Sequence, residues 1–509
     1  MSSPIAFFDA LARRPGFVLV SCGLIESWVW LGPLADGRLA QGLDSKLLAL
    51  LGASLAWALA FAVAGRSAER HSGPGRRPGW ALALVIVLTG LGLRGSALHT
   101  ELQASDDLWR YAYEGALVLE GESPYACAPA DPERASQAER WASLAAQVGH
   151  PEISAAYPPV AQAIFAGVMC ASGSLEPGPD GQPRWSPPEL PRVERDLRLA
   201  AVAADLLAWA LIVASAAGAA RWRLAVAWGW SPLVLMAFGA SAHFDVYGIA
   251  ALWLGLGLLG ARTGTAHLPR ARRAWAGVAL GVGVAIKFLP ALPMLAADRG
   301  LRRTRGFAVA SALVGSAWVL ALNDGSRGLT RGLANYTERW SSTNLLFRWI
   351  ERAAWWGSEQ LAGWTGSDLW TPAGALAPGR LARAAVLLLF LGAIAKTRRE
   401  RIGPRATAGA LLGAFTLLTP TLHPWYLCWW LPFAIERGRL GPTLLMIAGP
   451  LLYAPVGTFQ AGGEWSEPAW LWPAVLGPIA LLILVEVPWT LRASLERLRN
   501  AEAAAASDA

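Results

Sequence analysis

Residues 46–65, KLLALLGASLAWALAFAVAG, and residues 79–98, GWALALVIVLTGLGLRGSAL, are two apolar stretches that flank the basic link RSAERHSGPGRRP at 66–78. An apolar helix of about 20 residues is long enough to cross a hydrocarbon core of about 30 Å. Short loops rich in arginine lie on the cytoplasmic side of membranes. This segment therefore predicts two membrane-spanning helices joined by a short cytoplasmic loop.

The same pattern extends over the whole chain. Of its 509 residues, 54% are hydrophobic and only 16% are charged, and the mean hydropathy is +0.37. A soluble chain of this length needs more charge to cover its surface. The 27 tryptophans often lie near the ends of apolar blocks, as at Trp28, Trp80 and Trp470. Indole rings favour the membrane–water interface, so the composition indicates a membrane protein.

We predict an all-α, polytopic integral membrane protein with about 12–14 transmembrane helices, because each apolar block of about 17–25 residues is long enough to span a bilayer. Residues 1–500 are expected to form a single transmembrane domain, and the alanine-rich residues 501–509 a disordered tail. The candidate spans are 17–34, 46–65, 79–98, 157–172, 196–219, 222–241, 243–261, 274–297, 306–322, 380–396, 405–422, 424–436, 439–457 and 470–491.

The basic loops predict the orientation of the chain. Arginines at 66–77, 396–401 and 492–499 place these loops in the cytoplasm of a bacterial cell, with the protein in the plasma membrane. Loops 99–156 and 323–379 then lie on the extracytoplasmic side. The second loop mixes tryptophans and arginines, which favours an amphipathic helix at the membrane surface. The net charge of +8 follows from the same loops and does not require a nucleic-acid partner.

Block 274–297 does not fit a simple crossing. It contains Lys287 and two prolines, Pro290 and Pro293, and basic segments flank it on both sides. A broken, re-entrant pair of helices is one interpretation, provided that protein or a wet cavity covers its backbone. The alternative is a full crossing in which one basic loop departs from the positive-inside pattern. The four cysteines show no metal-ligand spacing and predict no disulfide framework.

The stretch SDDLWRYAYEG at residues 105–115 carries the first candidate site. On a helix, Asp107, Arg110, Tyr111 and Glu114 share one face. A carboxylate at a membrane-surface cavity can take the proton from an attacking hydroxyl, and a carboxylate pair can hold a divalent cation. The competing interpretation is a solvated helix N-terminus, where aspartate is favoured by capping and by the helix dipole.

Further candidates lie at the ends of predicted spans. SAHFDVYG at 241–248 contains His243 and Asp245, and TPTLHPWYLCWWLPF at 419–433 contains His423 and Tyr426. An interfacial loop and an aromatic belt would explain these two segments without any chemistry. Lys287 lies inside an apolar block, where a charge is costly unless it meets a cavity, an anion or a partner.

Together, DDLWRYAYEG, GESPYACAP, AAYPPVAQAIF, SAHFD, GVAIKFLP and LHPWYL occur in an order that resembles the GT-C superfamily of membrane glycosyltransferases. The chain is most similar to bacterial polyprenyl-phosphate-mannose-dependent mannosyltransferases of the alpha-1,2 and alpha-1,6 type. The matching pieces span residues 106–428. The chain departs from the pattern at Ala112 and Tyr113 and in the polar segment 131–149, to which the sequence assigns no role.

The resemblance implies a mechanism. A polyprenyl-phosphate sugar would be the donor, a glycan or lipid would be the acceptor, and Asp107 would be the catalytic base, with Asp106 as the alternative. Lys287, Arg110 or His423 would stabilise the leaving phosphate, and a divalent cation can take part in such sites. The residues expected to bind the donor phosphate or the substrates are Arg110, Tyr111, Glu114, Tyr157, His243, Asp245, Lys287, His423 and Tyr426.

Two other functions are compatible with a chain of many spans. A transporter or flippase of a lipid-linked glycan should carry paired broken helices in related halves, and the sequence offers only block 274–297. A non-catalytic scaffold would leave Asp106, Asp107 and Lys287 without a role. Neither the sugar nor the linkage can be read from these residues.

Overall fold

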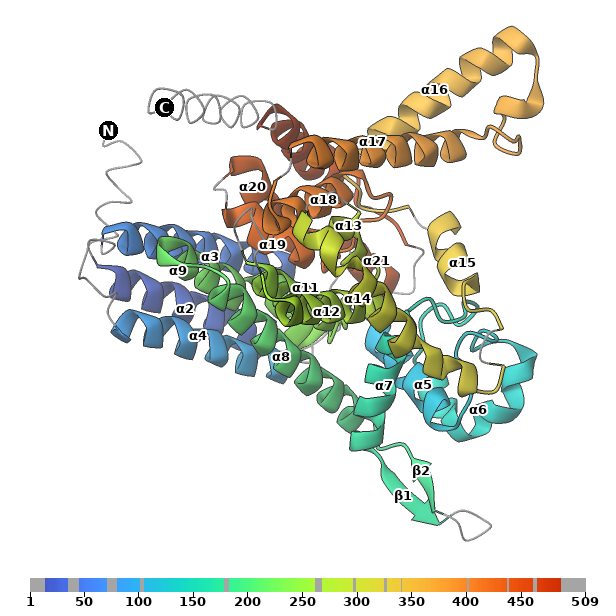
Figure 1. The fold of residues 1–509 in the computed structure, drawn as a ribbon, viewed down its shortest axis with the longest axis horizontal. Coiled ribbons are helices and arrows are strands. Elements are labelled where there is room, and N and C mark those ends of the chain that lie inside the picture. Colours follow the sequence, from blue (N-terminus) through green and yellow to red (C-terminus); the bar gives the residue numbers. More distant parts are fainter. Residues whose placement is uncertain are drawn as a thin grey trace.

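The computed structural model is almost entirely helical, as predicted, with 76% of residues in helices. It describes residues 14–34, 45–70, 80–100, 105–177, 183–260, 268–295, 299–324, 327–339, 341–400, 402–436, 439–460 and 465–486. The predicted tail at 501–509 lies outside them. Between α7 (Pro159–Ser172) and α8 (Leu190–Ala214), the strands β1 (Ser174–Pro177) and β2 (Pro183–Ser186) form an antiparallel hairpin that projects from the helices (Figure 1).

Long apolar helices from the first half of the chain lie side by side in one bundle (Figure 1). Two of them begin with a proline at the first or second helical position, where its missing N–H is not needed. The helices of this bundle are α2 (Pro15–Leu31), α3 (Ser45–Arg70), α4 (Trp80–His99), α8 and α9 (Gly218–Gly229).

A buried ion pair joins α4 to α8 inside this bundle. Arg94 Nε donates to Asp205 Oδ2 at 2.7 Å, and Trp228 Nε1 donates to Asp205 Oδ1 at 2.6 Å. Charges within a membrane span are tolerated when they are paired and hydrogen-bonded. The pair therefore fixes how α4, α8 and α9 meet.

The second half of the chain packs against this bundle. α11 (Asp245–Leu259) contacts α8 and α12 (Arg270–Ile286), and α12 packs along α14 (Arg299–Ala317). The remaining described helices are α10 (Pro232–Val234), η1 (Leu235–Ala240), α13 (Ala291–Met294), η3 (Trp318–Ala321), α15 (Arg331–Arg339), α16 (Phe347–Thr365), η4 (Asp368–Trp370), α17 (Pro378–Glu400), α18 (Pro404–Leu418), α19 (Tyr426–Glu436), α20 (Leu440–Ala448), η5 (Gly449–Tyr453), α21 (Ala454–Gln460) and η6 (Leu471–Leu476).

The described helices confirm a multi-pass membrane protein. Five are long and apolar enough to cross a membrane: Ser45–Glu69, Trp80–His99, Leu190–Ala214, Leu301–Ala321 and Pro378–Glu400. The bent pair of α9 with α10 and η1 makes a sixth if it is counted as one span, and five further apolar helices are shorter. Since several predicted blocks coincide with short helices such as α18 and α19, the count of 12–14 crossings stays a prediction.

The predicted extracytoplasmic loops contain the expected helices. In the first loop, α5 (Asp107–Leu119) packs against α7, and α6 (Pro132–Ala145) packs against α5. In the second, α16 forms a projecting hairpin with α17 (Figure 1). Trp356 and Trp364 on α16 are exposed, as an amphipathic surface helix requires. Its contact with a membrane and the orientation of the chain stay predictions.

Block 274–297 is broken, as its prolines predict. α12 ends at Ile286, Lys287 adopts extended backbone, and the chain re-forms only the short α13 after Pro290. A proline ring cannot continue the helical hydrogen-bond pattern. The break turns the lysine out of the helix and into a cavity.

Candidate active site

A cavity of about 190 Å³ lies where the two sequence halves meet. Three of the predicted site residues, Asp107, Lys287 and His423, all line it. Its lining residues are Ser105, Asp106, Asp107, Arg110, Tyr111, Gly149, His150, Ile153, Ser154, Ala156, Tyr157, Pro158, Phe244, Lys287, Phe288, Leu333, His423, Trp425, Tyr426, Val456, Phe459 and Trp465.

The aspartate pair opens α5 without capping it. Asp106 occupies the N-cap position, but its side chain makes no capping hydrogen bond, and the Asp107 N–H donates to Ser105 Oγ at 3.3 Å. Asp106 instead packs against Gly149, where any added Cβ would meet its carboxylate. The pair does begin a helix, as the competing interpretation predicts, but Asp106 does not cap it through its side chain, and both residues line the cavity.

Asp107 is a cavity-lining carboxylate whose pKa is strongly raised. Its side chain is 31% exposed, toward the cavity. Its pKa is raised from 3.8 to about 7, mainly because burial disfavours its charge and also because Asp106 repels it, although Arg110 and Lys287 act in the opposite direction. A carboxylate with a pKa near neutrality is suited to general-base catalysis.

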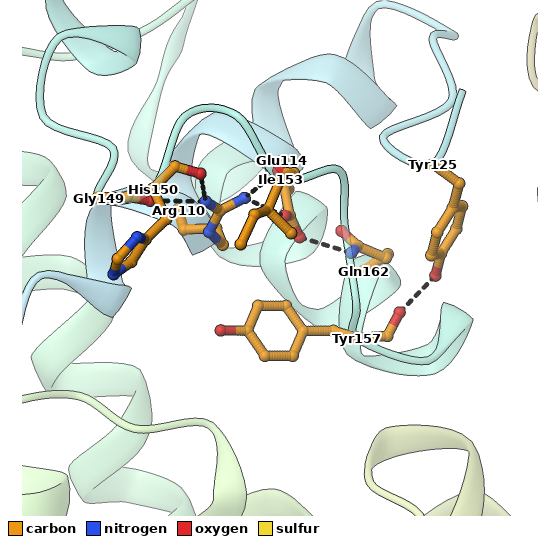
Figure 2. Close-up of polar contacts among 8 residues, drawn as sticks. All are labelled: Arg110, Glu114, Tyr125, Gly149, His150, Ile153, Tyr157 and Gln162. Atoms are coloured by element: carbon orange, nitrogen blue, oxygen red, sulfur yellow. Dashed lines mark hydrogen bonds and ion pairs between the residues drawn. The ribbon is translucent and has the colours of Figure 1, made fainter. Parts of the chain in front are cut away.

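Arg110 binds the backbone of the cavity-lining segment 149–153. Its Nη2 donates to the carbonyls of Gly149 at 2.6 Å and His150 at 2.8 Å, and its Nη1 donates to the Ile153 carbonyl at 3.0 Å (Figure 2). Glu114 Oε1 lies 3.5 Å from the same Nη1. Both terminal nitrogens are therefore engaged by protein acceptors, and this favours a structural role over the predicted phosphate contact.

Glu114 lies behind Arg110, outside the cavity lining. It is 2% exposed, and its Oε2 accepts from Gln162 Nε2 at 2.6 Å (Figure 2). Burial raises its pKa, while Arg110 and Gln162 favour its ionised form. Asp107, Arg110, Tyr111 and Glu114 do share one helical face, as predicted. Glu114 does not line the cavity, and it contacts Arg110 and Gln162 inside the protein.

Arg110→Leu should destabilise the protein by about 3–5 kcal/mol, because it leaves the Glu114 carboxylate buried without its cation. Thermal unfolding in detergent measures this loss. Arg327→Leu is a matched control: its ion pair with Glu133 is 46% and 60% exposed, and exposed pairs contribute about 1 kcal/mol or less. Equal losses in both variants would contradict the structural role of Arg110.

Aromatic rings form one wall of the cavity. Tyr111 stacks on Phe165 with centroids 4.6 Å apart, and Tyr157 meets Phe244 at 4.7 Å. The Tyr125 hydroxyl donates to the Tyr157 carbonyl at 2.6 Å and holds this segment in place (Figure 2). A largely aromatic wall with a few polar groups beside it is typical of ligand pockets.

Lys287 is a second cation in the lining of the cavity, besides Arg110. Its Nζ lies 3.0 Å from Asp245 Oδ2 and over the rings of Phe244 and Tyr426, at 4.8 and 4.7 Å from their centroids. Asp245 is fully buried outside the cavity lining, and Trp429 Nε1 donates to its Oδ1 at 2.7 Å. An ammonium has three N–H donors, so this one can still donate into the cavity.

The two predicted histidines enclose a tryptophan. The ring of Trp425 stacks on His243 at 3.6 Å and on His423 at 4.5 Å between centroids. His423 lines the cavity, and burial with the nearby Lys287 lowers its pKa to about 3. It is neutral at pH 7, so it can serve as a hydrogen-bonding group there but not as a cation for a phosphate.

Strained backbone gathers around this cavity. Four described residues other than glycine have positive φ, and three of them are His150 (53°), Ala242 (54°) and Thr343 (44°). His150 lines the cavity, Ala242 precedes His243, and the Thr343 hydroxyl donates to the Leu422 carbonyl at 2.8 Å, beside His423. Such conformations cluster at functional sites, where the surrounding structure enforces them.

Sequence reasoning missed several residues of the cavity. Trp425 and Trp465 line it, although the aromatic run at 419–433 is equally typical of an interface belt. The unassigned segment 131–149 contributes Gly149, which accommodates Asp106. A backbone carbonyl leaves no signal in a sequence, so its contact with Arg110 could not be predicted.

No three His, Cys, Asp or Glu side chains converge to hold a metal ion within the part of the chain that the structure describes. The Asp106–Asp107 pair supplies two carboxylates, fewer protein ligands than a dedicated cation site usually has. Mg²⁺ can nevertheless be held by one or two carboxylates together with substrate phosphates, so participation of a divalent cation stays a prediction.

Residues 373–440 match the family model of the MptB C-terminal domain. MptB is an alpha-1,6 mannosyltransferase of the GT-C type. This segment is similar to part of a membrane mannosyltransferase. It includes α17, α18 and α19, and it contributes His423, Trp425 and Tyr426 to the cavity. No curated protein and no solved structure matches the chain.

Proposed function

We propose that this protein is a mannosyltransferase that transfers a sugar from a polyprenyl-phosphate donor to a glycan or lipid acceptor on the extracytoplasmic side of the bacterial plasma membrane. One observation carries the proposal: a carboxylate with a pKa near 7 and a lysine ammonium line the same aromatic cavity. The similarity of residues 373–440 to part of a mannosyltransferase supports the choice of mannose.

The proposed reaction divides the work between these two groups. Asp107 takes the proton of the acceptor hydroxyl while that oxygen attacks the anomeric carbon of the donor sugar. The bond from this carbon to the phosphate oxygen breaks, and the polyprenyl phosphate leaves with an additional negative charge. Lys287 lies where it can neutralise this charge in an environment of low dielectric.

The transporter alternative gains one observation from the fold. α9 and the pair α10–η1 meet at a bend of 44°, so block 274–297 is not the only broken helix in the described part of the chain. Broken helices frame substrate sites in transporters. A flippase would move a lipid-linked glycan between leaflets without forming a glycosidic bond, which separates the two functions experimentally.

The decisive experiment uses the purified protein in lipid vesicles. It is incubated with radiolabelled polyprenyl-phosphate mannose and membrane acceptors, and both transfer and movement between leaflets are followed. Transfer of label to an acceptor would support the proposal. If the folded protein moves the labelled lipid and transfers no sugar from any such donor, the transporter takes its place.

The pH dependence of transfer should reveal the base. Because Asp107 has a raised pKa of about 7 and must be ionised to accept a proton, kcat/KM should fall about tenfold per pH unit below that pKa and level off above it. Initial rates between pH 5 and 9 measure this profile. A rate that stays constant from pH 5 to 7 would contradict this assignment.

A further inference from the structure

His243 is in contact with Asp107, the proposed base. Its Nδ1 is 3.5 Å from Asp107 Oδ2 and 3.3 Å from the Tyr111 hydroxyl, which is itself 3.5 Å from the same carboxylate oxygen. His243 Nδ1 and the Tyr111 hydroxyl therefore both lie beside the same oxygen of Asp107. The side chain of His243 is fully buried and does not line the cavity. In this structure it contacts Asp107 and not the space where a substrate would bind.

The backbone just before His243 is irregular and strained. The π-helix η1 ends just before it, Ala242 has a φ of 54°, and the His243 N–H donates to the Ala237 carbonyl at 2.9 Å. Its ring lies flat against Trp425. Its Nε2 has no hydrogen-bond partner among the residues that the structure describes. A buried polar atom without a partner is costly, so packing alone does not account for a histidine here.

We propose that His243 is a positioning residue for Asp107, and that its Nδ1 accepts a hydrogen bond from the carboxyl group once Asp107 has taken the acceptor's proton. This inference rests on the proposed function. In the resting state the Tyr111 hydroxyl donates to the Asp107 carboxylate or to His243. After proton transfer, the new O–H on Asp107 Oδ2 donates to His243 Nδ1. The Tyr111 hydroxyl, 3.5 Å from the same oxygen, can still donate to one of its lone pairs.

No proton passes to the imidazole in this step. The proton moves from the acceptor oxygen to Asp107 and leaves the cavity when the carboxyl group ionises again. In the active form of the protein Asp107 is ionised, and its carboxyl group becomes protonated only as the acceptor reacts. The hydrogen bond stabilises the protonated carboxyl, so it favours the transition state over this ionised ground state. His243 contributes to the rate without touching either substrate.

Several other groups face this cluster and contribute to its titration. Lys287 and Arg110 favour the ionised carboxylate, whereas Asp106 and Asp245 oppose it. The charged and titratable groups around Asp107 and His243 are Asp106, Arg110, Tyr111, Tyr157, Asp245, Lys287, His423, Tyr426 and Tyr453. None of them changes in the variants below, so a difference between variants reports on His243 alone.

The test compares His243→Ala with His243→Asn, whose amide can take the place of Nδ1. His243→Ala should lower kcat by about 10–100-fold while KM for both substrates stays within about threefold. Since the lost hydrogen bond favours protonated Asp107, the acid limb of the pH–rate profile should move about one unit to lower pH. His243→Asn should restore most of kcat and the original limb.

The control is Trp253→Phe, which alters another buried aromatic ring whose ring nitrogen has no hydrogen-bond partner in the described structure. It should leave kcat and the acid limb unchanged. If kcat falls in His243→Ala but the acid limb does not move, or if His243→Asn does not restore kcat, His243 has a merely structural role and the proposal is overturned. An unchanged kcat in His243→Ala would also overturn it.

A readout without activity separates this inference from the proposed function. The melting temperature of each variant between pH 4 and 9 follows the ionisation of Asp107, because its folded pKa is raised. The midpoint of this dependence should move to lower pH in His243→Ala and stay in place in His243→Asn. If the wild type transfers no sugar but this shift is found, the proposed function fails and the contact stands; an unmoved midpoint overturns the contact.

Discussion

Asp107→Asn should reduce sugar transfer by at least about 10²–10⁴-fold, since an amide cannot take the proton of the acceptor hydroxyl. Asparagine keeps the size of the side chain, and its amide can still contact the Tyr111 hydroxyl and His243 Nδ1, which lie 3.5 Å from Asp107 Oδ2. Donor binding should therefore persist. Initial rates with radiolabelled polyprenyl-phosphate mannose, together with binding of the donor, measure both effects.

The same substitution should make the protein more stable at neutral pH. The pKa of Asp107 is raised from 3.8 to about 7 in the fold, so the folded protein binds this proton more tightly than the unfolded chain. Ionisation therefore costs stability, and this cost grows between pH 4 and 7 and is complete above pH 7. The shift corresponds to about 4 kcal/mol, which solvent in the cavity reduces to about 1–2 kcal/mol.

The melting temperatures of wild type and Asp107→Asn should thus agree near pH 4 and diverge in favour of the variant toward pH 8. Asp106→Asn is the matched control, because it removes the neighbouring carboxylate and should retain transfer within about tenfold. If Asp106→Asn abolishes transfer and Asp107→Asn does not, the two residues exchange roles. If both variants transfer sugar at the rate of the wild type, neither is the base.

Helical spacing explains why the face of α5 could be predicted. Residues three and four apart are neighbours on a helix, so the contacts of Asp107 with Tyr111 and of Arg110 with Glu114 follow from the sequence once a helix is assumed. The sequence could not say that these polar groups are buried. Burial comes from Phe165 and Phe244, which belong to distant segments.

The costs of burial predict that a partner exists, but not which residue it is. A lysine in an apolar block needs an anion or a cavity, and Lys287 has both. Its anion, Asp245, is 42 residues away in the chain, and no local pattern links the two. The aromatic run at 419–433 is ambiguous for another reason. Tryptophans at a membrane interface and tryptophans that line a cavity give the same sequence pattern.

Hydropathy alone does not determine the number of spans, for a related reason. Hydropathy measures how apolar a stretch is, and buried helices of a membrane protein are apolar whether or not they cross the bilayer. α19 is almost completely buried and only 11 residues long, so it serves the core beside the cavity. The longest apolar stretches, such as those of α3 and α4, were the ones that the sequence placed best.

Removing the positive charge of Lys287 should reduce kcat by about 10²–10³-fold, because the leaving phosphate would then develop its charge without a cation. A single substitution is not a clean test. Lys287 is the ion-pair partner of the fully buried Asp245, and a buried carboxylate without its cation destabilises a protein by about 3–5 kcal/mol. Loss of activity in Lys287→Met alone would therefore mix chemistry with folding.

Asp245→Asn supplies the background in which the charge can be removed cleanly. The amide oxygen can still accept from Trp429 Nε1, which donates to Asp245 Oδ1 at 2.7 Å, and Lys287 remains. This variant should transfer sugar within about tenfold of the wild type. The double variant Lys287→Met with Asp245→Asn leaves no buried charge unpaired at this position, so it should fold and yet lose about 10²-fold or more relative to Asp245→Asn.

Product binding gives an independent measure of the same charge. Polyprenyl phosphate without a sugar carries the negative charge of the leaving group, so its inhibition constant should rise in the double variant, while that of a neutral polyprenol should not change. Equal rates and equal inhibition by polyprenyl phosphate in the double variant and in Asp245→Asn would refute a role for Lys287 in the reaction. The ion pair with Asp245 would then serve only to anchor the break between α12 and α13.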